Sequence, residues 1–293
     1  DITETAIDGK SYPVNEQIVF ETSFCKLLHF KKEKSPQQPR LLMIAPMAGH
    51  YATLLRDTVR ASLPYFDVYV TDWMNARDIP ISHGGFDMDG YIATLVRCFE
   101  HLAPDFHVMS ICQSGVPAYA AVALLEGRTD VCELLPNTLT IMGSPIAVRT
   151  SPTVVNGYAT DNDEDWSETM SPSTVPEGYA GERRLVYPGF IQLMAFISMN
   201  PQHHQKSITD AMNHYISGDF TAIKRQRVDR RVDMVLSEHR GDMGVVVMYA
   251  KHRDATLTRH LSGKAPCVRV LVVVVRNQRW RDLQHLEHVA DGF

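Results

Sequence analysis

The feature that most constrains the fold is an alternation of short apolar runs and helical patterns in the first half of the chain. The apolar runs have the length of buried strands and occupy residues 41–46, 67–73, 106–111 and 138–143. The helical patterns lie between them, at residues 51–63, 89–102 and 116–125. Strands joined by short helical connections are typical of βαβ units. We therefore predict a mostly parallel central sheet flanked by helices.

The alternation stops after residue 149, and strand patterns return only at residues 245–249 and 268–275. The stretch between contains an acidic loop, a Ser/Pro-rich part and helical segments rich in Met, Phe and His. Structureless loops of this length are uncommon in compact domains, so an inserted cap is the better interpretation. The predicted units are residues 1–149 and 242–293 for the core and residues 150–241 for the cap.

Composition narrows the classes of function. Apolar residues make up 44% of the chain and charged residues 22%, which is typical of a soluble globular protein. The net charge of −5 argues against nucleic acid as a partner. The five cysteines are widely spaced and form no CxxC pair, so we expect neither a disulfide framework nor a metal site, and no cofactor. No apolar run approaches the roughly 20 residues of a membrane span. A reducing compartment, the cytoplasm, is the expected location.

One local motif carries the chemistry. The third apolar run leads directly into Ser110-Ile111-Cys112-Gln113-Ser114 and then into a helical pattern. This is a variant of the hydrolase elbow G-x-S-x-G, which needs small residues two positions before and after a nucleophile on a sharp strand-to-helix turn. Cys112 stands at the nucleophile position, and a helix N-terminus lowers the pKa of a thiol. Together with the sheet and the cap, the motif predicts an α/β-hydrolase fold.

Two other interpretations of the motif stay open. Buried cysteines often act as small apolar residues, so Cys112 could simply pack in the core. Ser114 is a rival nucleophile, although an elbow centred on it would put the branched Val116 at a position that requires a small residue.

The oxyanion-hole donors follow from the same geometry. The N–H of Gln113, the residue after the nucleophile, would face the developing oxyanion. A second donor comes from the loop after an earlier strand, here the segment that begins with Pro46-Met47-Ala48. Proline has no N–H, so Met47 is the predicted donor, with Ala48 as the next choice.

The sequence resembles that of the intracellular polyhydroxybutyrate depolymerases. The resemblance extends over roughly residues 41–218 and is carried by Cys112-Gln113-Ser114-Gly115-Val116-Pro117 and by the segments 45–56, 69–80, 142–146, 186–190 and 198–200. It implies a carboxylic ester hydrolase that cleaves 3-hydroxyalkanoate esters, with the family's cysteine nucleophile matched by Cys112. The implied partner is a polyhydroxyalkanoate polymer or oligomer, and the implied location is the cytoplasm, on polymer granules.

The resemblance also implies an aspartate and a histidine. The aspartate should follow the penultimate strand, where Asp254 stands. The histidine should follow the last strand in a Gly-His-Tyr-Gly segment, but the chain runs there directly into Arg276-Asn277-Gln278. A missing loop, a histidine that has moved and a loss of activity are the three explanations. His260, His285 and His288 are nearby in sequence, and none of them is assigned.

Two alternative functions follow from these observations. Without a triad histidine, the chain could be a granule-binding or scaffold protein that kept the fold. Polyester synthases of the hydrolase fold also use a cysteine elbow, so a synthase or acyltransferase is a further alternative. The sequence leaves the oligomeric state open, including a homo-oligomer.

Overall fold

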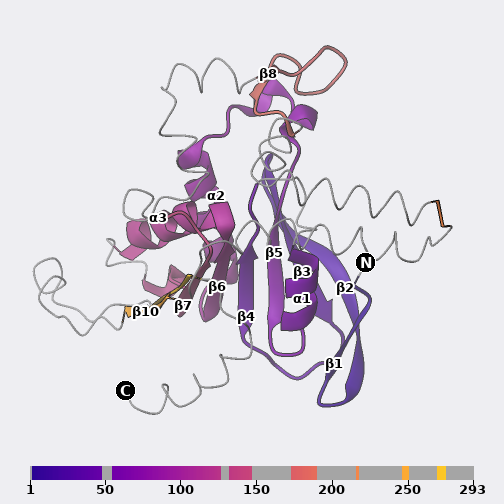
Figure 1. Ribbon diagram of the computed structural model, residues 1–293, viewed down its shortest axis with the longest axis vertical. Helices are drawn as coiled ribbons and strands as arrows, with labels where there is room; N and C mark the ends of the chain where they lie inside the picture. Colours follow the sequence, from indigo (N-terminus) through magenta and orange to yellow (C-terminus); the bar gives the residue numbers. More distant parts are fainter. Residues whose placement is uncertain are drawn as a thin grey trace, which may run out of the picture.

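A nine-stranded mixed sheet organises the computed structural model, which describes residues 2–47, 55–126, 132–146, 173–189, 216–217, 246–250 and 269–274. The strand order is β1-β2-β3-β5-β4-β6-β7-β11-β10 (Figure 1). The strands are β1 Glu4–Ile7, β2 Lys10–Glu21, β3 Cys25–Lys32, β4 Arg40–Ile44, β5 Asp67–Trp73, β6 Phe106–Ile111, β7 Thr138–Met142, β10 Val246–Ala250 and β11 Arg269–Val274. The predicted α/β architecture is confirmed.

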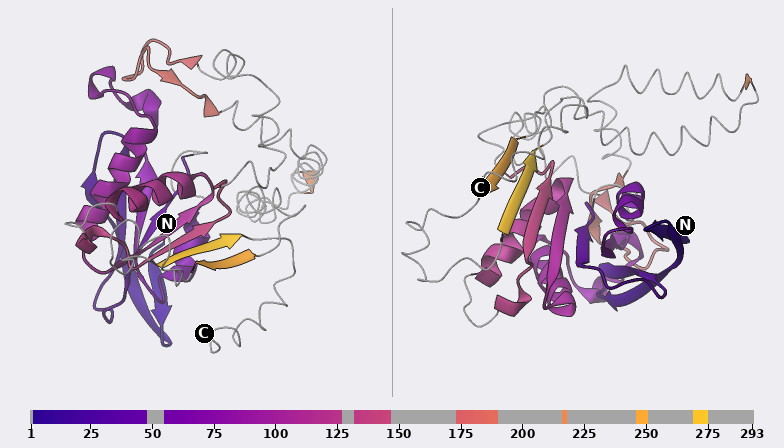
Figure 2. Two further views of the ribbon diagram at one scale, coloured as in Figure 1. Left: turned by 90° about the vertical axis from the view of Figure 1, so that its left-hand side faces the viewer. Right: turned by 90° about the horizontal axis from the view of Figure 1, so that it is seen from below.

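Three helices connect the central parallel strands: α1 Arg56–Ser62, α2 Met88–Leu102 and α3 Gly115–Glu126. Strand β4 pairs in parallel with both β5 and β6, and β6 pairs in parallel with β7. The chain therefore steps from β4 in one direction to β5 and then returns past β4 to β6 and β7. Because such crossovers are right-handed, this reversal puts α1 on one face of the sheet and α2 and α3 on the other (Figures 1 and 2).

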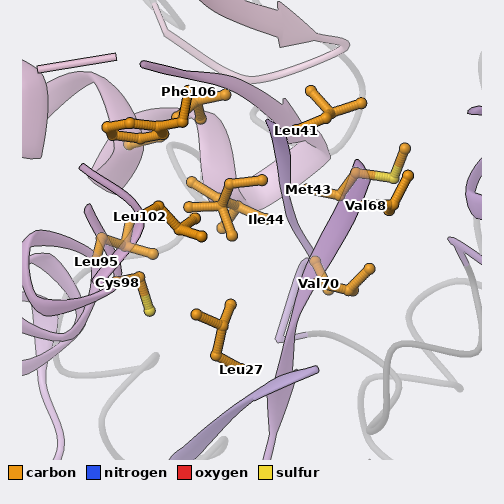
Figure 3. Close-up of a cluster of buried hydrophobic side chains, with 14 of the residues drawn as sticks. Leu27, Leu41, Met43, Ile44, Val68, Val70, Leu95, Cys98, Leu102 and Phe106 are labelled. Carbon is orange, nitrogen blue, oxygen red and sulfur yellow. The ribbon is translucent and has the colours of Figure 1, made fainter. Parts of the chain in front are cut away.

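The two sides of β4 line two halves of the core. Leu41 and Met43 lie on the side of Val68 and Val70 of β5, with which they pair in register, whereas Ile44 points to the opposite side (Figure 3). Helix α2 supplies that side with Leu95, Cys98 and Leu102. Both faces of β4 are buried, as its uninterrupted apolar run predicts.

Helix α2 begins at an N-cap aspartate and has a different buried face from the one predicted. The Asp87 Oδ1 atom accepts a hydrogen bond from the Gly90 N–H at 2.8 Å. Leu95, Phe99 and Leu102 are buried as predicted, but Ile92 and Val96 are only half-buried. Tyr91, Thr94 and Cys98 take their place in the buried face.

Residues 4–32 form an antiparallel meander that precedes the alternating strands and helices. Strands β1, β2 and β3 pair in succession, and β3 joins the edge of β5. Most side chains of β2 are exposed or half-buried, so its pattern lacks the strong apolar signal of a core strand. Figure 1 shows this meander on the side of the sheet away from α2 and α3.

The predicted strand patterns near the C-terminus are confirmed as β10 and β11, and β11 pairs in parallel with β7. Strand β10, however, lies at the outer edge and is antiparallel to β11 (Figure 2). Ala250, at the end of β10, pairs with Val270 near the start of β11. The carboxyl end of β10 therefore lies at the sheet edge opposite to the carboxyl ends of β6 and β7.

Most of the predicted cap lies outside the described residues, and the 150–241 boundary stays a prediction. The described part includes β8 Ser173–Thr174 and β9 Leu185–Val186, which pair with each other. Between them, Arg184 is buried, and its guanidinium donates hydrogen bonds to the carbonyl oxygens of Ile79, Pro80 and Gly84. This side chain joins segment 173–189 to the loop after β5. In the part of the chain that the structure describes, no helix has the length and apolarity needed to cross a membrane.

We predict that Arg184→Met releases segment 173–189 without unfolding the sheet. Methionine keeps much of the side-chain volume but leaves the carbonyls of Ile79, Pro80 and Gly84 without their charged donor, at a cost of about 2 kcal/mol. Amide hydrogen exchange within 173–189 should then be about 30-fold faster, while exchange in β4 and β6 should not change. The matched control is Arg183→Met, because the Arg183 side chain is 82% exposed. Equal exchange rates in the two variants would contradict this role of Arg184.

Candidate active site

Cys112 occupies the turn between β6 and α3 with a backbone conformation that non-glycine residues rarely adopt. Its φ angle is +59°, whereas the preceding Ile111 is extended at φ −126° and the following Gly115 is helical at φ −64°. A 3-10 turn over Cys112–Ser114 leads directly into α3. A left-handed residue here costs on the order of 1–3 kcal/mol, so the surrounding packing must maintain it. The sharp strand-to-helix turn predicted from the sequence is present, and its thiol is half-buried.

The two serines at the small positions are fully buried, as the elbow motif requires. The Ser110 hydroxyl lies 3.4 Å from the carbonyl oxygen of Thr140 on β7. The Ser114 hydroxyl accepts a hydrogen bond from the Ile111 N–H at 2.9 Å and donates to the Ile44 carbonyl at 2.8 Å. Ser114 therefore connects the ends of β6 and β4. A side chain that is 0% exposed is unsuited to attack a substrate, which weakens the case for Ser114 as the nucleophile.

Gly115 is a further essential residue of the turn that the sequence analysis did not single out. A Cβ atom on Gly115 would lie 2.1 Å from the Ser144 Oγ atom and 2.8 Å from Ile141 Cγ2. Since the backbone of Gly115 is ordinary helix, the requirement is for space rather than for conformational freedom. The sequence did carry a signal for this requirement: Gly115 follows Ser114 directly and is a third small residue in the motif after Ser110 and Ser114.

Two other described cysteines differ from Cys112 in their surroundings. Cys25 and Cys98 are fully buried. Burial raises the pKa of the Cys25 thiol well above its usual value, with a further increase from Cys98. Burial also raises the pKa of Cys98 to about 12. Both thiols therefore stay protonated near neutral pH, and the thiolate is the reactive form.

The predicted oxyanion donors extend from neighbouring strands. Ile44 of β4 pairs with Ser110 of β6, so Met47 and Gln113 both lie three residues beyond a shared register position. Met47 is half-buried against the core, and Gln113 is exposed. As the second residue of the turn that begins α3, Gln113 has an N–H group that needs no partner within the helix. The roles of Met47 and Gln113 stay predictions, and Ala48 lies outside the described residues.

The strand order reverses at β4, next to the carboxyl ends of β4 and β6 from which these residues extend. Helix α1 leaves β4 toward one face, whereas α3 leaves β6 toward the other, and ligands of open α/β sheets bind outside the carboxyl ends at such a point. The strained turn with its candidate nucleophile lies at this same edge, which is where hydrolases carry their elbow. The chain has the α/β-hydrolase fold.

Comparisons with known proteins agree with the sequence resemblance. Residues 143–230 of the chain match the family model described as "PHB de-polymerase C-terminus", which confirms the resemblance to the polyhydroxybutyrate depolymerases. No curated protein sequence matches the chain significantly.

Solved structures resemble the chain more distantly. The thioesterase domain from the curacin biosynthetic pathway has a TM-score of 0.34 and 13% identity, covering 50% of this chain and 50% of that chain. The N-formylmaleamic acid deformylase of Pseudomonas putida S16 has a TM-score of 0.36 and 17% identity, covering 50% of this chain and 54% of that chain. The chain thus spans about half the length of both proteins, and the fold assignment rests on strand order and the elbow.

Asp254 lies outside the described residues and stays a prediction. Asp254 is implied by the resemblance alone, which places an aspartate after the penultimate strand. Because β10 is antiparallel to β11, its carboxyl end lies at the opposite edge, and strand direction gives Asp254 no support.

Several histidines of the chain have partners away from the elbow. His29 pairs with Asp67 at 2.8 Å, His83 lies 3.1 Å from the Ser23 hydroxyl, and His107 lies 2.8 Å from the Thr138 hydroxyl. His260, His285 and His288 lie outside the described residues. Among the described residues, no group of three or more His, Cys, Asp or Glu side chains is arranged to hold a metal ion.

We predict that Gly115→Ala lowers the free energy of unfolding by about 1–3 kcal/mol, because its methyl group would overlap the Ser144 side chain. The overlap can be relieved only by displacing α3 or β7, so hydrolysis of p-nitrophenyl butyrate should fall as well. Gly85→Ala is the matched control, since a Cβ there has no heavy atom within 4 Å. Urea unfolding and the hydrolysis rate measure both effects. Wild-type stability and activity in Gly115→Ala would contradict this account of the turn.

Proposed function

We propose that this α/β hydrolase cleaves 3-hydroxyalkanoate esters through an acyl-enzyme on Cys112. The observation that carries the proposal is the left-handed backbone of Cys112, at the strand-to-helix turn where the strand order reverses. Strain at a half-buried thiol is unexpected for a residue that only packs, and it is typical of a functional site. The match of residues 143–230 to the polyhydroxybutyrate depolymerase model favours a polyester of hydroxyacids as substrate.

The proposed reaction is an acyl transfer in two steps. In the first, the Cys112 thiolate attacks the ester carbonyl carbon, and the C–O bond to the leaving hydroxyacid unit breaks as that oxygen takes a proton. In the second, water attacks the thioester and releases a 3-hydroxy acid and the thiol. The N–H groups of Met47 and Gln113 would stabilise the negative oxygen in both steps. The N-terminus of α3 favours negative charge at Cys112.

The proton transfers require a base, and an imidazole oriented by Asp254 completes the proposal. The support for Asp254 is its match to the aspartate that the resemblance implies after the penultimate strand; the direction of β10 adds nothing to it. No particular histidine is proposed. Asp254→Asn would test the assignment, because it keeps the shape of the side chain and removes the charge that orients an imidazolium.

The surroundings of the elbow suit an apolar, uncharged chain. Val116 and Tyr119 of α3 are exposed in the first two turns after Cys112, and Ile146 is exposed just beyond Ser144, which contacts Gly115. These side chains offer an apolar surface beside the proposed nucleophile. A polyester with short aliphatic side groups has no charge to be desolvated by such a surface.

We predict that Cys112→Ala lowers the release of 3-hydroxybutyrate from amorphous polyhydroxybutyrate granules by about 1,000-fold or more, because the covalent step is lost. The matched control is Cys98→Ala, which makes the same change at a buried thiol and should retain turnover. Released acid is measured enzymatically over time. An unchanged rate in Cys112→Ala would remove Cys112 from the mechanism.

The same variants separate the alternative functions. A polyester synthase would act on 3-hydroxybutyryl-coenzyme A, so polymer formation from that thioester, with no hydrolysis of granules, would replace the depolymerase proposal. A scaffold protein would sediment with granules and release no acid in either the wild-type protein or Cys112→Ala.

A further inference from the structure

The end of β4 is held by side chains in place of a strand partner. In the sheet, β4 pairs with β5 as far as Met43 and with β6 as far as Ile44. Ala45 lies two residues beyond the last pair with β5 and one beyond the last pair with β6, and it is only 1% exposed. Its N–H and carbonyl groups must therefore find other partners, because unpaired buried backbone groups are costly.

Three buried side chains supply those partners. The Thr71 Oγ1 atom accepts a hydrogen bond from the Ala45 N–H at 3.0 Å. The Trp73 Nε1–H donates to the Ala45 carbonyl at 2.8 Å, and the Tyr91 hydroxyl donates to the same oxygen at 3.3 Å. Thr71 and Trp73 come from β5, whereas Tyr91 comes from α2. One carbonyl thus receives two donors from two different elements.

The two donors also support each other. The Trp73 and Tyr91 rings meet edge to face, with centroids 4.4 Å apart. Each side chain is 4% exposed. Burial raises the pKa of Tyr91 above its usual range. The Tyr91 hydroxyl therefore keeps its proton and stays a donor at any pH at which a thiol enzyme works.

Trp73 and Tyr91 influence the backbone that leads to Met47, because Ala45 lies only two residues before it. Two donors on its carbonyl oxygen fix the plane of the Ala45–Pro46 peptide. The proline ring then restricts φ of Pro46 to a narrow range. Only one soft dihedral, ψ of Pro46, separates the anchored peptide from the Met47 N–H.

We propose that Trp73 and Tyr91 are positioning residues that hold the Met47 N–H in the oxyanion hole through the Ala45 carbonyl. This inference rests on the proposed function, since it needs an oxyanion to form beside Met47. A preorganised donor is effective because it does not have to reorient during the reaction. The two side chains would act on the charged intermediate and leave the reactivity of the thiol itself unchanged.

The test compares two reactions of the same thiol in the full chain. Acylation of Cys112 by p-nitrophenyl butyrate, followed as a burst of p-nitrophenolate, develops a negative carbonyl oxygen. Alkylation by iodoacetamide displaces iodide at a saturated carbon and develops no such oxygen. The variants are Tyr91→Phe, Trp73→Phe and the double variant. Tyr69→Phe is the matched control, because it also removes a hydroxyl, one that donates to Asp67.

We expect each single variant to acylate about 10-fold more slowly and the double variant about 100-fold more slowly, since small misplacements of a catalytic group have effects of this size. Alkylation of Cys112 should stay within about twofold in all of them, and Tyr69→Phe should change neither reaction. Tyr91→Phe alone decides the question if the tryptophan variants fail to fold.

Two results would overturn the inference: acylation at the wild-type rate in Tyr91→Phe and Trp73→Phe, or an equal slowing of acylation and alkylation, which would mean that the thiol itself has moved. Failure of the proposed function is recognised separately. In that case the wild-type protein gives no burst, or Cys112→Ala gives the same burst as the wild type.

Discussion

The contact of the turn at Cys112 with the ends of the neighbouring strands is the constraint on which the rest of the site depends. The Ser114 hydroxyl, fully buried, accepts from the end of β6 and donates to the end of β4. Gly115 brings α3 so close to Ser144 that a methyl group has no room. The unfavourable φ of Cys112 is thus maintained by packing that spans β4, β6 and β7. The half-buried Cys112 is thereby fixed at the carboxyl edge of the sheet.

The reversal of the strand order makes that edge a binding place. Because β4 connects toward β5 and β6 connects toward β7, their following helices cover opposite faces and leave the carboxyl ends uncovered between them. The reversal also deprives Ala45 of a strand partner, and Thr71, Trp73 and Tyr91 fill this role. The same topological feature therefore separates the strands around the candidate site and recruits side chains that stiffen it.

The features that could be predicted from the sequence are those determined by residues close to one another along the chain. Strands β5 and β6 have the predicted bounds because their apolar runs are bounded by polar or turn residues, and the elbow was recognisable because strand, turn and helix are contiguous. Strand β2 was missed because most of its side chains are solvent-accessible. The small residue at position 115 was visible in the sequence, but the contact of Gly115 with Ser144 and that of Ala45 with Trp73 were not, since these partners are distant in sequence. The apolar run of β10 does not encode its direction, so the antiparallel pairing with β11 could not be foreseen when the resemblance pointed to Asp254.

The most direct test of the central claim is to trap the acyl group on the protein. The chain would be mixed with a p-nitrophenyl ester of 3-hydroxybutyrate, quenched in acid during the burst, digested, and analysed by peptide mass spectrometry. The account predicts one 3-hydroxybutyryl group, removable by hydroxylamine, on the Cys112 thiol of the peptide that spans the elbow. An acyl group on Ser114 or on another residue, or turnover with no acylated peptide, would contradict it.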